Sequence, residues 1–149
     1  MALAVGDRAP NFTTQDTQGN SISLTDFAGK TVILYFYPKD DTPGCTKESC
    51  SFRDRYDAYR EKDLIVLGVS ADDVTAHQQF SQKFNLPFPL LADIDGSIIR
   101  AYGVQRPGYD QPFASRVTYV INGAGEIIRV YESVQTETHA TDILVDLGL

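Results

Sequence analysis

The segment Thr31–Phe36 constrains the fold of this chain more than any other, because five consecutive apolar residues follow Thr31. They are aliphatic or aromatic, a composition typical of a strand that is buried on both faces of a sheet. A second apolar run of this kind spans Leu64–Ser70. The sequence between the two runs has helical character, so the segment predicts a right-handed βαβ unit with two parallel central strands.

Two amphipathic helices are expected around these strands. Phe52, Tyr56 and Tyr59 recur at i, i+4 and i+7, which predicts a helix that ends near Lys62–Asp63 with its aromatic stripe in the core. The alternative, an aromatic face that binds a ligand, is less typical of this spacing. A second helix is predicted from its acidic cap at residues 72–73 to Phe84. We expect the histidine on that helix, His77, to be a solvated surface residue.

The remaining elements are short and are marked by turn residues. Two hairpins are predicted, each around a turn rich in Gly, Asn or Asp. The expected elements are an N-terminal hairpin (11–15 and 21–24), a strand (88–93), a helical turn (97–102), a loop that forms a mobile rim (105–112), a second hairpin (117–121 and 126–131), and a last helix with Ile143, Leu144 and Leu147 inward.

Length and charge narrow the class of protein. The chain has 149 residues, which predicts one domain over 1–149, and no apolar run approaches the ~20 residues that cross a bilayer. Its net charge of −7 argues against nucleic acid and anionic membranes as partners. The N-terminus has no basic stretch ahead of an apolar one. We therefore expect a cytoplasmic protein, the alternative being a mature plastid form whose transit peptide was removed.

The two cysteines lie in one segment directly after the first apolar run. Pro38 ends the strand, Thr42 is a good N-cap residue, and Pro43 suits the first helical position, so Cys45 falls in the first turn of a helix. Unpaired amides and the positive end of the helix dipole favour a thiolate there. The alternative for Cys45 is a small buried hydrophobe, but the polar segment around it is unlike a core.

A closed zinc site is a weaker interpretation of the two cysteines. Cys45 and Cys50 lie far in sequence from both histidines, His77 and His139, which are themselves widely separated. With so few cysteines, redox chemistry in a reducing compartment is the better interpretation, and we expect neither a metal nor a cofactor.

The pattern Pro38-x-x-x-Thr42-x-x-Cys45 resembles the active-site signature of the peroxiredoxins. Cys50, five residues on, resembles the second cysteine of the bacterioferritin comigratory protein and peroxiredoxin Q branch. The resemblance extends from Gly6–Phe12 to the C-terminal helix. It implies a thioredoxin-like α/β fold with a mixed central sheet, flanking helices and an N-terminal hairpin extension, in agreement with the order of the predicted elements.

The resemblance also implies a mechanism. Cys45 would attack a hydroperoxide and become a sulfenic acid, which would condense with Cys50 to an intramolecular disulfide that thioredoxin reopens. The Thr42 hydroxyl would orient the peroxide and Pro38 would shield the pocket from water. Arg116 would supply the fixed positive charge and Glu48 would orient that arginine. From the residues alone, a surface arginine at a strand end and an exposed helical glutamate remain the alternatives.

Two other functions compete with a thiol peroxidase that reduces hydrogen peroxide and organic hydroperoxides. A thioredoxin-like disulfide oxidoreductase would be expected to carry Cys-x-x-Cys, whereas four residues separate the cysteines here. A redox-sensing binding module could use the same cysteine pair without turnover. Relatives with this cysteine spacing are often monomers, so a monomer is expected.

Overall fold

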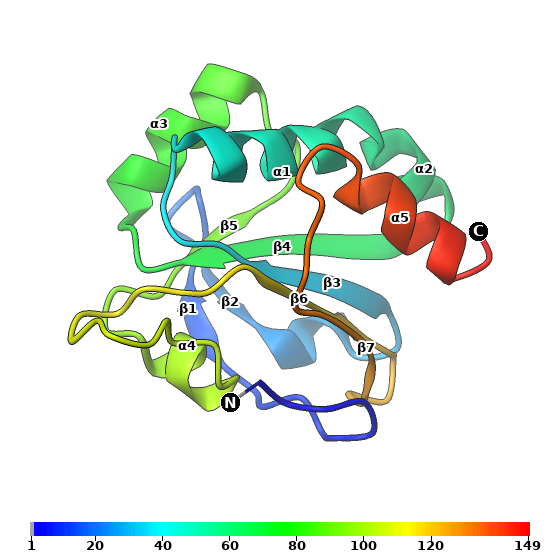
Figure 1. Cartoon of the computed structure of the whole chain (residues 1–149). Helices are drawn as coiled ribbons and strands as arrows, with labels where there is room; N and C mark the ends of the chain where they lie inside the picture. The colour runs from blue at the N-terminus through cyan, green and yellow to red at the C-terminus, as the bar shows by residue number, and fades with distance from the viewer. Residues whose placement is uncertain (1) are drawn as a thin grey trace.

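The parallel core of the sheet is built by the two apolar runs. The computed structural model describes residues 2–149, and its strands lie in the order β2-β1-β5-β4-β3-β6-β7 (Figure 1). β3 (Thr31–Phe36) and β4 (Leu64–Ser70) pair in parallel, and β5 (Leu90–Ala92) pairs in parallel with β4. The predicted parallel pairing of the two runs is confirmed.

Antiparallel strands complete both sides of the sheet. β1 (Thr13–Gln15) and β2 (Ser21–Ser23) form the N-terminal hairpin, and β1 also pairs with β5. On the other side, β6 (Val117–Ile121) pairs with β3, and β7 (Ile127–Tyr131) pairs with β6. The sheet is therefore mixed, as predicted.

Helices cover both faces of the sheet (Figure 1). One face carries the four longer helices and the other carries a short helix and a 3-10 turn. The first group is α1 (Pro43–Asp54), α2 (Tyr56–Glu61), α3 (Val74–Phe84) and α5 (His139–Asp146); the second is α4 (Ser97–Ala101) and η1 (Leu24–Phe27). None of the helices within residues 2–149 is long and apolar enough to span a membrane.

The side chains of β3 alternate between two hydrophobic cores, because successive residues of a strand point to opposite faces. Leu34 and Phe36 pack with the residues of α4. Ile33 and Tyr35 pack in the other core, which also contains Cys45 and Phe52 of α1. The position of Cys45 is thus coupled to the aromatic core on the four-helix face.

The helix expected to end near Lys62–Asp63 is not continuous. Arg55 leaves helical geometry with φ −107° and ψ 9°, so α1 ends at Asp54 and α2 begins at Tyr56. The break is local and leaves the aromatic stripe in place: Phe52 and Tyr59 are buried. Side-chain periodicity therefore located the core face although it did not reveal the break.

The prediction of a solvated His77 is wrong. The side chain is buried, with no exposed surface. His77 lies three residues before Phe80 on α3, so both side chains occupy the inward stripe of the helix. A polar side chain at an apolar position of the stripe must find hydrogen-bond partners in the core, and His77 finds one on the loop that precedes α1 and one on β5.

Candidate active site

The strand register brings Cys45 and Arg116 together from distant parts of the sequence. Phe36, the last residue of β3, pairs with Val117, the first residue of β6. Arg116 therefore lies at the end of the sheet where β3 leaves for the loop into α1. Cys45 is the third residue of that helix.

The guanidinium of Arg116 connects the cysteine to a buried acid. Its Nη2 lies 3.4 Å from Cys45 Sγ, and its Nη1 donates to Glu48 Oε1 at 2.8 Å. Cys45 and Glu48 are both buried, and the Arg116 side chain is 21% exposed. The surface alternatives for Arg116 and Glu48 are thereby excluded, and a fixed positive charge stands beside the sulfur.

Glu48 is held in an unusual electrostatic environment. Burial raises its pKa to about 7, and the charge and hydrogen bond of Arg116 oppose that shift. Oε2 is the one buried side-chain oxygen or nitrogen within residues 2–149 that lacks a hydrogen-bond partner. Burial alone would disfavour the charged form of Glu48, and the contact with Arg116 is what stabilises that form.

Sequence reasoning missed a neighbour of Glu48, the buried His139. Its Nε2 lies 3.8 Å from Glu48 Oε2 and 2.8 Å from the hydroxyl oxygen of Thr118. Burial lowers the pKa of His139 to about 4; Arg116 adds to this shift and Asp142 opposes it. His139 is therefore a neutral neighbour at pH 7 and not a second cation. No local motif identifies His139, because α5 and α1 are far apart in the sequence and come into contact only in the folded protein.

The first turn of α1 offers unpaired amides beside the sulfur. Thr46 N–H donates to Thr42 O at 2.8 Å, but in the described part of the chain no acceptor is bonded to the amides of Gly44 and Cys45. Thr42 is the N-cap residue, yet its hydroxyl donates to Lys39 O at 2.9 Å instead of capping the helix. The two amides are thus available to an oxygen of a bound molecule.

Gly44 makes the close approach of Arg116 feasible. A Cβ on Gly44 would lie 2.9 Å from Arg116 Nη2, nearer than such atoms normally come. Because Gly44 has no side chain, the Arg116 guanidinium can lie next to the Cys45 sulfur. The sequence alone does not reveal this constraint.

Pro38 lies at the edge of a hollow of about 400 Å³ next to the loop that leads to Cys45. The side chain is half-buried, and its role as a shield against water stays a prediction. The segment expected to form a rim supplies Tyr109, Gln111 and Pro112 to the wall, and the next residue, Phe113, has its ring centroid 4.7 Å from that of Tyr109. An apolar group could be accommodated beside Pro38.

Cys50 is a half-buried free thiol on the same helix as Cys45. Burial raises its pKa; Arg53 opposes the shift and Asp54 adds to it. Five residues of α-helix give a rise of about 7.5 Å and a Cα separation of about 8.6 Å, beyond the ~7 Å limit for a disulfide. The two sulfurs can bond only if α1 unwinds.

Comparisons with known proteins agree with this geometry. Residues 5–130 match the model of the AhpC/TSA family. A bcp protein of Coxiella burnetii is 45% identical over 97% of this chain and 98% of its own length. A chloroplastic peroxiredoxin Q of wheat (Triticum aestivum) is 41% identical, over 95% of this chain and 65% of its own.

A solved structure extends the similarity to three dimensions. The bacterioferritin comigratory protein of Xanthomonas campestris, solved for insight into its alkyl peroxide reduction activity, is 30% identical. It has a TM-score of 0.85 over 92% of this chain and 90% of its own. The fold and the cysteine site are those of a thiol peroxidase, and the chain belongs to the AhpC/TSA family of peroxiredoxins. Within it, the homologues identify the Bcp and peroxiredoxin Q subfamily.

Gly44→Ala is expected to slow reaction with peroxide by roughly ten- to a hundred-fold, since displacing a positioned group by ~1 Å has effects of this size. Its backbone is compatible with alanine, which favours helix, so thermal stability should be kept. The displaced group is the end of the Arg116 side chain. Stopped-flow measurement of Cys45 oxidation tests this, and a rate within twofold of wild type would show that Arg116 tolerates the Cβ.

Proposed function

We propose that this peroxiredoxin reduces hydrogen peroxide and organic hydroperoxides with Cys45 as nucleophile, Cys50 as resolving thiol and a thioredoxin-like dithiol as reductant. The observation that carries the proposal is the bridge made by Arg116, 3.4 Å from Cys45 Sγ and 2.8 Å from Glu48 Oε1. A cation fixed at this position favours the thiolate over the thiol and stabilises charge on the departing oxygen.

In the first step the Cys45 thiolate attacks one peroxide oxygen. The S–O bond forms as the O–O bond breaks, and the leaving oxygen takes a proton to become water or an alcohol. The unpaired amides of Gly44 and Cys45 are suited to hold the peroxide. The Thr42 hydroxyl already donates to Lys39 O, so its lone pairs are left to accept the hydrogen of the peroxide.

In the second step the Cys50 sulfur attacks the sulfenic acid, the S–S bond forms and water leaves. Burial, which raises the Cys50 pKa, is relieved when α1 unwinds. The same motion therefore brings the sulfurs together and makes Cys50 more nucleophilic. A dithiol then reduces the disulfide by exchange.

The hollow beside Pro38 supports organic hydroperoxides as substrates in addition to hydrogen peroxide. Its volume of about 400 Å³ and its aromatic wall of Tyr109 and Phe113 suit an alkyl chain. We further propose a monomer of one domain that acts in the cytoplasm, where a reducing thiol pool would regenerate it.

Consumption of NADPH coupled through thioredoxin reductase and thioredoxin tests the function, with hydrogen peroxide and cumene hydroperoxide compared as substrates. Peroxide-dependent turnover is expected. Reduction of insulin disulfides without peroxide would instead support the disulfide oxidoreductase. A single oxidation without turnover would support a redox-sensing module.

Oxidation is expected to melt the start of α1 reversibly. Far-UV helical signal should fall and amide exchange should rise from Thr42 to about Phe52 in the disulfide form, and dithiothreitol should reverse both changes. Unwinding forfeits a few hydrogen bonds at about 1 kcal/mol each, a small cost beside peroxide reduction. In the control Cys50→Ser the helix should persist after stoichiometric peroxide. Equal exchange in reduced and disulfide forms would contradict the unwinding.

A further inference from the structure

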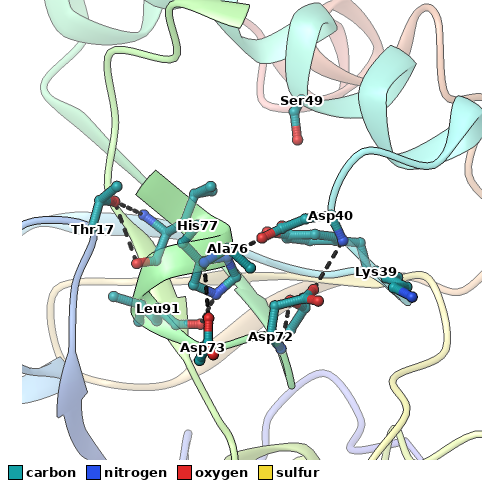
Figure 2. A network of polar contacts seen from close by, with 12 residues as sticks. Thr17, Lys39, Asp40, Ser49, Asp72, Asp73, Ala76, His77 and Leu91 are labelled. Atoms are coloured by element: carbon teal, nitrogen blue, oxygen red, sulfur yellow. Dashed lines mark hydrogen bonds and ion pairs between the residues drawn. The ribbon is translucent and has the colours of Figure 1, made fainter. Parts of the chain in front are cut away.

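The buried His77 bonds two parts of the chain on opposite sides of its ring. Nδ1 lies 2.6 Å from Asp40 Oδ2, and Nε2 lies 2.9 Å from the carbonyl oxygen of Leu91 (Figure 2). Leu91 belongs to β5 and Asp40 to the loop that joins β3 to α1. His77 therefore ties the loop before Cys45 to the rigid sheet.

The hydrogen bond between His77 Nδ1 and Asp40 Oδ2 forms whether its proton is on the nitrogen or on the oxygen. Leu91 O can only accept, so Nε2 carries a hydrogen. Asp40 Oδ1 accepts from the Tyr37 hydroxyl at 2.6 Å, which leaves Oδ2 facing Nδ1. One proton between Oδ2 and Nδ1 then gives each of these side-chain atoms a hydrogen-bond partner. Both residues are buried. Such a bond is stronger than one at the surface.

Other contacts fix the same loop. The Asp40 amide donates to Asp72 Oδ2 at 2.9 Å (Figure 2). Asp72 Oδ2 also accepts from the Ser70 hydroxyl at 2.6 Å. The next loop residue, Asp41, has a left-handed φ of 59°. This shape is disfavoured for a residue with a Cβ and persists because its surroundings impose it.

The side chains of Asp40, Asp72 and His77 could in principle hold a metal ion, because their ligand atoms lie within 4.8 Å of one another. The hydrogen bonds argue for protons instead. Asp40 Oδ2, Asp72 Oδ2 and His77 Nδ1 are each already engaged with a donor or acceptor within the group or with Ser70. The cluster is complete without a cation.

The first turn of α1, which must move if Cys45 is to reach Cys50, follows directly on the loop that His77 holds. Toward the C-terminus of α1, Ser51 Oγ accepts from the Ala140 amide at 3.0 Å, and Arg53 Nη1 donates to Phe84 O at 2.8 Å. At its start Pro43 is exposed. Only Asp41 and Thr42 separate Pro43 from Asp40, so movement of the first turn strains the contact with His77.

We propose that His77 is a positioning residue that acts through Asp40 to hold the loop in the form that reacts with peroxide, and so sets the fate of the Cys45 sulfenic acid. The inference rests on the proposed disulfide cycle. In the wound form, a second hydroperoxide converts Cys45–SOH to Cys45–SO₂H and an alcohol or water. In the unwound form, Cys45–SOH and Cys50–SH give the disulfide and water. A tight contact between His77 and Asp40 favours the wound form and therefore oxidation of Cys45 to the sulfinic acid.

Two substitutions of His77 test its hydrogen bonds to Asp40 and to Leu91 O separately. The amide of His77→Gln can reach the position of Nε2 and keep the bond to Leu91 O, but loses the bond to Asp40. The amide of His77→Asn replaces Nδ1 and keeps the bond to Asp40. Lys83→Gln is the control, since it breaks the exposed 2.9 Å ion pair of the same helix with Asp41.

Stopped-flow rates of both steps and mass spectrometry of Cys45 after a peroxide titration supply the readouts. In His77→Gln, disulfide formation should be about ten-fold faster, and the peroxide dose for half-conversion to sulfinic acid should rise in proportion. The first oxidation should be slower. His77→Asn and Lys83→Gln should stay within about twofold of wild type. Tyr37→Phe, which removes one donor to Asp40, should shift the partition in the same direction by less.

A merely structural histidine would lower stability in both His77 variants without changing the partition, which would overturn the inference. Equal shifts in both variants would show that the partition does not depend on the Asp40 bond in particular, and a shift in His77→Asn alone would assign control to the Leu91 bond; either result would overturn the inference as well. If His77→Gln does not fold, an unchanged partition in Tyr37→Phe has the same force. Failure of wild type to form the Cys45–Cys50 disulfide would instead refute the proposed cycle and this inference with it.

Discussion

Cys45→Ser is expected to remove peroxide turnover entirely, leaving only the background rate. A serine hydroxyl ionises far less readily than a thiol, so the Arg116 guanidinium 3.4 Å away would have no anionic nucleophile to stabilise. Loss of a nucleophile of this kind costs a factor on the order of 10⁶. Competition assays that follow consumption of hydrogen peroxide measure it directly.

The fold should survive this change, because serine differs from cysteine by one atom and Cys45 contributes little volume to its core. Far-UV spectra and thermal melting of Cys45→Ser should match those of the reduced wild type, apart from a modest loss for a buried hydroxyl. Substantial residual turnover in a folded Cys45→Ser protein would show that another group attacks the peroxide.

Arg116→Ala is expected to slow the first oxidation by roughly 10²–10³-fold, the range found when one preorganised donor is removed from a site of this kind. The variant removes the hydrogen bonds to both Cys45 and Glu48 and leaves the buried carboxylate without its counter-charge. Stopped-flow measurement of Cys45 oxidation by hydrogen peroxide gives the loss directly.

Two further arginine variants sharpen the result. Arg116→Lys should recover only part of the rate, because a lysine ammonium does not reproduce the planar fork that bridges the sulfur and Glu48. Arg129→Ala removes an exposed arginine of β7 whose side chain donates to the adjacent Ile128 O at 2.8 Å, and should behave like wild type. Arg116→Ala kinetics equal to those of Arg129→Ala would return Arg116 to the role of a surface charge.

Much of the fold was predictable because the strongest signals were local. The apolar composition of Thr31–Phe36 and Leu64–Ser70 identified the central strands, and turn residues marked both hairpins. The start of α1 was predicted correctly from Thr42 and Pro43: Pro43 is the first helical residue, although the Thr42 hydroxyl bonds to Lys39 O and does not cap the helix. Such features need no knowledge of distant contacts.

The missed features depend on contacts between distant segments. His77 was expected at the surface because a lone histidine on a helix usually is, and only the packing of α3 against β5 and the loop provides its partners. His139 reaches Glu48 from α5 in the same way. Arg116 was predicted from resemblance to a family; its position beside Cys45 follows physically from the β3–β6 register, which is a long-range pairing.

The placement of α1 over an aromatic core has a consequence for the lifetime of the protein. The helix packs with its own Phe52 against Tyr35 and Tyr37 of this core, and the exposed Lys47 lies between the two cysteines. While α1 is wound, its backbone is protected from proteases. Unwinding in the disulfide form turns the cysteine segment into an extended, cleavable chain and bares apolar surface. With the proposed unwinding, we expect the oxidised enzyme to be cleaved faster than the reduced one, so that the abundance of the protein falls with the peroxide load when reductant runs short.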